Sequence, residues 1–368
     1  METMVLDQAA CRTRQARLLE VMREQDVAWV VVQRHENVQW LTGQRLPWSM
    51  SGLAALAADG RMVLVVPESC RSEGVAADEV IDYAAQPLCT MRNDQLAAAA
   101  DVLRDVVAPR IGAGRVGLEF SVATRHLDWP AGAPYDIEPQ LYRLRRRKEP
   151  DELALIRRAI AATEAMYARA REMIEPGIDE LTLFNALQTA AVESCGEMLS
   201  GTGNDYQCGS PGGAPRAGRR AEAGELYILD LGPAYRGYFA DNARTIAVTQ
   251  PTDMQFEAWR RVTSVFPVIE SSVRPGVSAR QLFEQIRDEL AAAPLGTFPH
   301  HLGHGIGLFP HEAPHLNDFW DDTFEVGDVF TVEPGLYDPA LRAGLRIEND
   351  YVVTESGVEC LTRFPLDL

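Results

Sequence analysis

The chain has 368 residues, of which 46% are hydrophobic and 24% charged, and its formal net charge is −18. This is the composition of a folded chain, and the length suits two domains better than one core. The negative charge disfavours nucleic acid and anionic membranes as partners, because both would repel the chain. The sequence shows neither a signal peptide nor an apolar run that could span a bilayer, and its six cysteines are scattered, so we expect a cytoplasmic protein.

The first 145 residues alternate between helix and strand patterns, which predicts a small α/β domain. The dipeptide Asp59-Gly60 between two apolar runs predicts a hairpin turn. The expected elements are, in chain order, a helix over 12–24, strands over 27–32, 53–58 and 62–66, a helix over 93–107 and a strand over 116–119.

A basic stretch, Arg143 to Lys148, leads into Glu149-Pro150-Asp151. Proline just inside a helix start marks a new element, so we predict domains at 1–145 and 146–368. We interpret the basic side chains as a solvated linker and helix entrance rather than as a site for a polyanion.

The second part again alternates helices and strands, with a glycine- and proline-rich loop over 201–218. The expected elements are helices over 151–174, 179–195, 253–273 and 278–292, and strands over 226–229, 241–248, 329–332 and 345–353. The fold class is therefore α/β, or α+β, in both parts.

Four carboxylates stand at the ends of apolar runs in the second part. Asp230 ends the run 226–229 and Asp241 begins the next strand, so an antiparallel pair would place both carboxylates side by side. Glu333 and Glu348 each close a later apolar run. Buried carboxylates need partners, and a divalent cation is one such partner.

Five of the seven histidines lie between residues 300 and 315, which is rare for scattered surface or core histidines. They are His300, His301, His304, His311 and His315. Four carboxylates, one imidazole and two divalent cations come close to electrical neutrality, which favours two metals over one. Two adjacent metals can activate a bridging water and polarise a carbonyl, so the pattern indicates hydrolysis.

The chain resembles the aminopeptidase P, prolidase and creatinase family in five short strings. They are DLG at 230–232, DNART at 241–245, HGIGLFPHE at 304–312, TVEPGLY at 331–337 and LRIE at 345–348. The resemblance implies a pita-bread catalytic domain of two pseudo-symmetric halves behind a creatinase-like N-terminal domain. It also implies a homodimer, a small peptide as substrate and two divalent metal ions, with manganese first and cobalt, zinc or iron as alternatives.

The resemblance implies a role for each matching position. The implied metal ligands are Asp230, Asp241, His304, Glu333 and Glu348. Asp241 and Glu348 would bridge both metals, and Glu333 would also be the general base that moves the proton. His311 would contact the substrate and stabilise the tetrahedral intermediate. The implied substrate-pocket residues are His300, His311 and Arg346. We expect His301 and His315 to lie beside the ligands or at the surface.

The sequence departs from the family pattern at two places. The family carries a histidine in the loop before the first ligand strand, whereas the corresponding stretch around Gly213 has none. Ala243 replaces a usual threonine. Three hypotheses stay open. The first is a peptidase that cleaves before proline, as a dipeptidase or an aminopeptidase, in which Arg216, Arg219 or a water replaces the missing histidine. The second is a metal-dependent enzyme for a small non-peptide C–N substrate, and the third is a non-catalytic scaffold.

Overall fold

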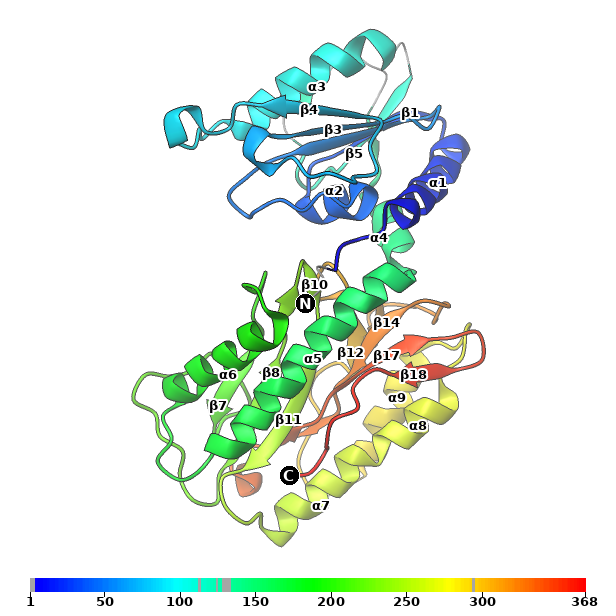
Figure 1. The fold of residues 1–368 in the computed structure, drawn as a ribbon. Coiled ribbons are helices and arrows are strands. Elements are labelled where there is room, and N and C mark those ends of the chain that lie inside the picture. Colours follow the sequence, from blue (N-terminus) through cyan, green and yellow to red (C-terminus); the bar gives the residue numbers. More distant parts are fainter. Residues whose placement is uncertain (1–3, 112–113, 124, 128–133, 293–294) are drawn as a thin grey trace. The chain divides into compact units, whose positions relative to one another are not determined.

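The computed structural model describes residues 4–111, 114–123, 125–127, 134–292 and 295–368 (Figure 1). These residues form two compact units, Met4–Arg145 and Arg146–Leu368. Within the described residues, no helix is long and apolar enough to cross a membrane.

The first unit is built on a six-stranded mixed sheet of order β4-β3-β2-β1-β5-β6. The elements up to the unit boundary are α1 (Gln8–Glu24), β1 (Val27–Val32), α2 (His35–Thr42), β2 (Leu53–Ala57), β3 (Met62–Pro67), β4 (Glu79–Tyr83), α3 (Gln95–Ile111), β5 (Arg115–Leu118), β6 (Tyr135–Asp136) and α4 (Glu138–Arg146). The predicted hairpin is confirmed, because β2 and β3 pair antiparallel across a turn in which Gly60 adopts a φ of +93°.

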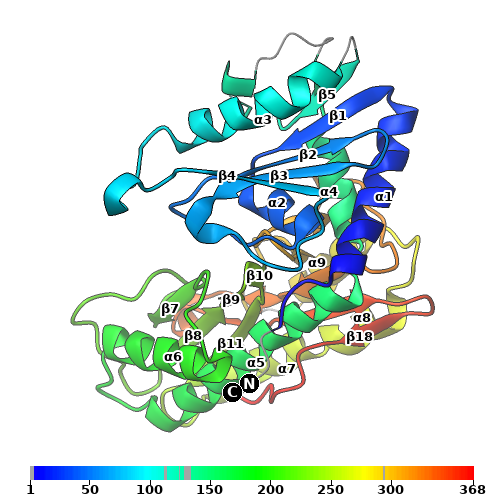
Figure 2. The same cartoon turned by 45° about the horizontal axis from the view of Figure 1, so that its top comes forward.

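Helices cover both faces of this sheet (Figures 1 and 2). Trp29 and Val31 of β1 share one core cluster with Leu103 and Val107 of α3. Val30, which points to the opposite face, is equally buried, and there α1 and α2 pack. Because the sheet is covered on both faces, its inner strands β1, β2 and β3 are continuous apolar runs rather than alternating ones.

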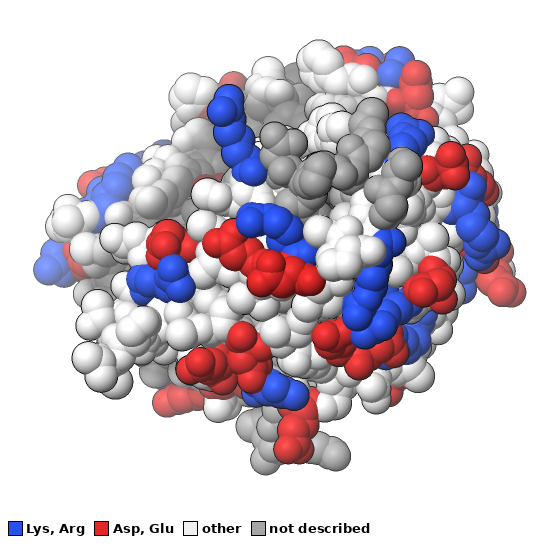
Figure 3. Space-filling view, turned by 90° about the horizontal axis from the view of Figure 1, so that it is seen from above, with Lys and Arg blue, Asp and Glu red and all other residues white. Residues whose placement is uncertain are grey.

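Charged side chains of both signs are interspersed on the face of the molecule that Figure 3 shows. Surface ion pairs in the first unit follow this pattern, as between Arg12 and Asp78 or Arg71 and Asp82. Although the net charge is −18, acidic side chains do not form a uniform negative surface on this face.

The second unit contains two principal sheets, of order β11-β8-β7 and β13-β12-β14-β17-β18. Its helices are α5 (Pro150–Met173), α6 (Glu180–Cys195), α7 (Asp253–Thr263), α8 (Val265–Ser272) and α9 (Ala279–Ala291). Its strands are β7 (Asp205–Cys208), β8 (Leu226–Leu231), β9 (Ala234–Tyr235), β10 (Tyr238–Phe239), β11 (Asn242–Ala247), β12 (Gly303–Gly305), β13 (Glu312–Leu316), β14 (Val329–Val332), β15 (Gly335–Leu336), β16 (Leu345–Arg346), β17 (Asn349–Val353) and β18 (Val358–Cys360).

Each sheet of this unit carries helices on one side (Figure 1). Helices α5 and α6 pack together beside β8 and β11, and α7 to α9 form one apolar core with the second sheet. The expected α/β class is confirmed. The opposite sides of the two sheets hold the polar residues described below.

The structure corrects three sequence-based expectations about elements. The helix predicted over 253–273 is two helices that meet at Ser264, because Pro267 cannot donate to the carbonyl of Thr263. The strand predicted over 345–353 is divided at Ile347-Glu348, where the chain leaves β15 for β14. Part of the loop predicted over 201–218 is strand β7, which pairs with β8.

The basic stretch before α5 is only partly solvated, which is a further correction. Arg146 makes a two-point ion pair with Asp328, and Lys148 donates to Glu312 at 2.9 Å. The Lys148 side chain is 1% exposed and that of Asp328 is fully buried. Fixed ion pairs, rather than a solvated linker, therefore fasten the entrance of α5 to the second sheet.

Candidate metal centre

Strands β8 and β11 present two of the predicted ligands on one face. Ala243 lies opposite Asp230 in the antiparallel register, so Asp241, two residues earlier, projects from the same face. Asn204 ties the two carboxylates together, since its Nδ2 donates to Asp230 at 3.3 Å and to Asp241 at 2.9 Å. Strand β8 extends past the predicted end, and Asp230 lies inside it.

His304 is the central residue of β12, between two glycines. A Cβ at Gly303 would lie 2.0 Å from the carbonyl oxygen of Thr331, and one at Gly305 would lie 2.1 Å from that of Ala313. The neighbouring strands β14 and β13 therefore approach so closely that only glycine fits beside the histidine. This packing fixes where the His304 imidazole stands.

Glu333 and Glu348 reach the site from the second sheet. The backbone N–H of Glu333, just after β14, donates to Leu302 at 2.8 Å. Glu348 lies between β16 and β17, and its N–H donates to Ala243 of β11 at 2.9 Å. Glu348 thus stands where the two halves of the unit meet.

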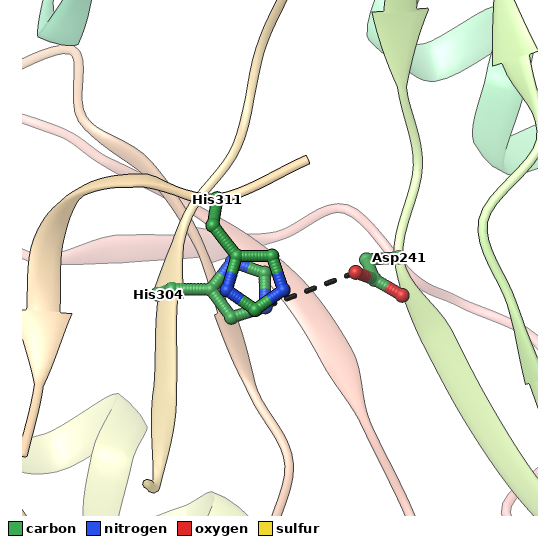
Figure 4. Close-up of side chains that lie close together, drawn as sticks. All are labelled: Asp241, His304 and His311. Carbon is green, nitrogen blue, oxygen red and sulfur yellow. Dashed lines mark ion pairs between the residues drawn. The ribbon is translucent and has the colours of Figure 1, made fainter. Parts of the chain in front are cut away.

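The five predicted ligands converge, although they come from widely separated segments. In each of two groups, the candidate ligand atoms lie within 4.8 Å of one another. The groups are Asp230, Asp241 and Glu348, and His304, Glu333 and Glu348. Glu348 belongs to both. His304 Nε2 lies 3.8 Å from Asp241 Oδ2, which links the groups a second time (Figure 4).

The protein compensates the carboxylates of the first group only in part, because Arg346 Nη2 lies 2.9 Å from Asp230 Oδ2 while Asp241 and Glu348 have no cationic side chain paired with them among the described residues apart from His304. Burial, followed by repulsion from neighbouring carboxylates, raises the pKa of Asp241 and Glu348 well above their ordinary values. Burial also raises the pKa of Asp230. Glu348 Oε2 is buried without a hydrogen-bond partner among the described residues. An orphaned acceptor among crowded carboxylates fits a divalent cation.

Two members of the second group, Glu333 and His304, have pKa values below the ordinary ones, unlike the carboxylates of the first group. Burial would raise the pKa of Glu333, but the hydrogen bond from His301 and the nearby imidazoles lower it to about 2. The Nε2 atom of His301 lies 2.8 Å from Glu333 Oε1. Burial lowers the pKa of His304 to about 3, which keeps its imidazole neutral and able to act as a ligand.

The predicted substrate residues surround these groups. The His311 ring stacks on His304 with centroids 3.7 Å apart and remains exposed (Figure 4). His300 Nε2 lies 2.9 Å from the hydroxyl of Tyr337, and Arg346 Nη1 donates to the same hydroxyl at 3.3 Å. A chain of polar side chains therefore lines one side of the centre.

The remaining two clustered histidines separate. His301 contacts Glu333 directly, whereas His315 pairs with Asp322 at 2.8 Å and stacks on Trp320 at the surface. This agrees with the expectation that they lie beside the ligands or at the surface.

Two family models match the chain. "Creatinase/Prolidase N-terminal domain" matches residues 14–146, and "Metallopeptidase family M24" matches residues 154–355, which is more than half of the chain. The chain belongs to metallopeptidase family M24. It is a metallopeptidase, and its second unit has the pita-bread fold of that family.

Relatives of this M24 chain include proteins described only as uncharacterized peptidases. YqhT of Bacillus subtilis is 27% identical over 349 residues, which are 92% of this chain and 94% of YqhT. A peptidase of Staphylococcus epidermidis is 31% identical over 233 residues, which are 62% of this chain and 66% of that protein.

Solved structures share the fold across both units. The Xaa-Pro dipeptidase from Bacillus anthracis superposes with a TM-score of 0.80 at 24% identity, over 97% of this chain and 99% of that chain. Dipeptidase PepE from Mycobacterium ulcerans gives a TM-score of 0.76 at 25% identity, over 99% of this chain and 98% of that chain.

The glycine-rich loop of this M24 chain is held by its own ion pairs. Arg216 pairs with Glu180 of α6, and Arg219 pairs with Glu225. Both guanidinium groups, which we considered as replacements for the loop histidine, thus serve the structure of the loop.

Sequence reasoning missed three polar residues at this M24 centre: Asn204, Asp205 and Tyr337. Asp205 lies directly opposite Asp230 on the neighbouring strand β7. The sequence pattern that could have revealed Asp205 is weak, because β7 is short and lies in a glycine-rich segment whose composition predicts a loop. Tyr337 closes the string TVEPGLY and was available as a candidate.

Proposed function

We propose that this protein is an Xaa-Pro peptidase that hydrolyses the peptide bond before proline at a centre of two divalent metals. The observation that carries the proposal is the convergence of two ligand groups that share Glu348. Four carboxylates and one imidazole would hold two divalent cations at near neutrality. Glu348 belongs to both groups, and Asp241 of the first group lies 3.8 Å from His304 of the second. The similarity to solved Xaa-Pro dipeptidases supports the substrate class.

The ligand set we propose is that predicted from the sequence: Asp230, Asp241, His304, Glu333 and Glu348. Divalent ions bound there would supply an activated water and polarise the scissile carbonyl. Neutral His304 and the ionised carboxylate of Glu333 are already in the protonation states that ligands require.

The protein's own groups would then bind the peptide and move its proton. The Glu333 carboxylate would accept one proton from the attacking water and pass it to the leaving nitrogen as the C–N bond breaks. The hydrogen bond from His301 holds this carboxylate in place. Exposed His311, stacked on His304, would donate to the developing oxyanion. His300 and Tyr337 would form the wall of the substrate pocket.

We assign manganese as the metal and a cytoplasmic homodimer as the working form. Oxygen-rich sites with one imidazole suit manganese, with cobalt, zinc and iron as competitors. None of the six cysteines forms a disulfide in the part of the chain that the structure describes, which suits a reducing compartment. The expected binding partner is a small peptide, which is the substrate.

A peptide panel tests this function. Protein reconstituted with Mn²⁺ should hydrolyse Ala-Pro, Gly-Pro or Ala-Pro-Ala and leave Ala-Ala-Ala intact, and chelator treatment should abolish turnover. Product release is followed by chromatography. If full metal occupancy brings no proline-peptide turnover, the Xaa-Pro assignment is wrong. The second candidate, a small non-peptide C–N substrate, would then be favoured, because the missing histidine near Gly213 alters the substrate side.

Metal binding should reverse the pH dependence of stability. In the metal-free chain Asp241 and Glu348 have raised pKa values, so the folded state binds protons that the unfolded state releases. Their stabilisation is present below the ordinary carboxyl pKa and is lost as pH rises through the folded pKa. The lowered pKa of Glu333 has the opposite effect: its contribution to stability is present above the ordinary carboxyl pKa and is lost only as pH falls below that value.

The melting temperature of the metal-free protein should therefore decrease as pH rises above the ordinary carboxyl pKa, while the gain in melting temperature from added Mn²⁺ increases in the same direction. Differential scanning fluorimetry with chelator or with Mn²⁺ measures both. A gain from Mn²⁺ that shrinks as pH rises would contradict the proposed ligand set.

A further inference from the structure

Arg346 already has a carboxylate partner that is not a predicted ligand. Its Nη2 makes a close ion pair with Asp205 and lies 2.9 Å from Asp230 Oδ2, while Nη1 donates to Tyr337. The Arg346 residue is 8% exposed. A guanidinium binds a free carboxylate best through two parallel N–H donors, and here both terminal nitrogens are engaged.

The charges around Arg346 balance only when Asp205 is counted. Four ligand carboxylates would be neutralised by two divalent cations, and Asp230 is one of the four. The positive charge of Arg346 would then be free to attract an anionic substrate group if Asp205 were absent. The carboxylate of Asp205 cancels that charge at the wall of the pocket.

The glycine-rich loop is built around Asp205. The N–H of Gly213 donates to Asp205 Oδ1 at 2.6 Å, and Gly213 adopts a φ of +125°. A Cβ at Gly213 would lie 2.7 Å from Nε2 of Gln207, and one at Gly212 would lie 2.3 Å from Asp205 Oδ2. A side chain at Gly212 would displace the Asp205 carboxylate, and one at Gly213 would displace the Gln207 amide. The loop that lacks the expected histidine is therefore also the loop that holds Asp205 beside Arg346.

We propose that Asp205 is a specificity-determining residue that occupies Arg346 and thereby selects peptides without a free carboxylate on the residue after the scissile bond. The substrate class is then a peptide that continues beyond the proline, or one that ends in an amide, rather than a free dipeptide. This inference rests on the proposed function. A free dipeptide would have to displace Asp205 from the guanidinium, whereas a neutral amide leaves the ion pair intact.

Matched substrates test the inference. For the Mn²⁺-loaded full chain, kcat/KM on Ala-Pro-NH2 should exceed kcat/KM on Ala-Pro by at least about tenfold, which corresponds to about 1.4 kcal/mol. Asp205→Asn keeps the shape and an acceptor for Gly213 but removes the charge, so it should lower this ratio about tenfold by improving Ala-Pro turnover. Asp205→Glu, which keeps the charge, should retain the preference for the amide.

Glu359→Gln is the matched control, because it removes one negative charge from an ion pair with Arg157 at the surface. It should leave the ratio unchanged. A wild-type preference for Ala-Pro, or an Asp205→Asn variant that lowers both turnovers equally, would overturn the inference while the proposed function stands. If fully loaded protein hydrolyses neither these two substrates nor Gly-Pro nor Ala-Pro-Ala, the proposed function fails together with the inference. Should Asp205→Asn not fold, the wild-type ratio alone decides.

Discussion

Glu333→Gln is expected to lower kcat on the best proline peptide by about 10²–10⁴-fold, the usual contribution of a general base. The substitution keeps the size of the side chain and removes the charge that accepts the proton. The pKa of Glu333, lowered to about 2, keeps this carboxylate ionised across the working pH range. Steady-state kinetics with Mn²⁺-loaded protein measures the effect.

Glu333 is also a predicted ligand, so metal content must be measured in the same samples. Glu355→Gln, an exposed surface change, serves as the control and should leave kcat unchanged. Loss of kcat at unchanged metal content would assign the loss to proton transfer, and loss with reduced metal content would assign it to ligation. Wild-type kcat in Glu333→Gln would remove Glu333 from the mechanism.

Arg146→Met is expected to destabilise the chain by about 3–5 kcal/mol, because it leaves a buried carboxylate without its partner. Arg146 donates Nε and Nη2 to Asp328 at 3.0 and 2.7 Å, and the same Nη2 bonds the carbonyl of Thr323 at 2.7 Å. Asp328 is fully buried, so water cannot replace the guanidinium. The free energy of unfolding is measured by urea denaturation followed by circular dichroism.

The adjacent Arg147 supplies a control of identical chemistry. It is exposed, so Arg147→Met should change the free energy of unfolding by no more than about 0.5 kcal/mol. Equal effects of the two substitutions would show that the ion pair with Asp328 contributes nothing specific. A double change, Arg146→Met with Asp328→Leu, should recover much of the loss, since it removes the unpaired charge.

Local sequence patterns predicted most elements because the strands and helices of this chain carry strong apolar periodicity. The hairpin at Asp59-Gly60 and strand β1 are examples. The error at Ser264 had a local cause, since Pro267 was present in the sequence and breaks the hydrogen-bond pattern of a continuous helix. Strand β7 was missed because four residues between glycine-rich segments give too little alternation to detect.

The chemistry of the centre was also predictable to a large extent. Buried carboxylates that close apolar runs need partners, and the family strings contain four such carboxylates and one histidine in the family's order. The structure brings these side chains together. The experiments described above test whether they bind metal and how many ions they hold.

The sequence by itself thus determined the fold class, the metallopeptidase family and the candidate ligands, because these depend on periodicity and on short strings of neighbouring residues. Tertiary structure alone decided that Arg146 is buried on Asp328 and that Asp205 occupies Arg346. These partners are 182 and 141 residues apart along the chain. From the sequence alone, a charged residue is expected to be solvated. Only the packing of distant strands determines whether it is buried and which oppositely charged residue it pairs with.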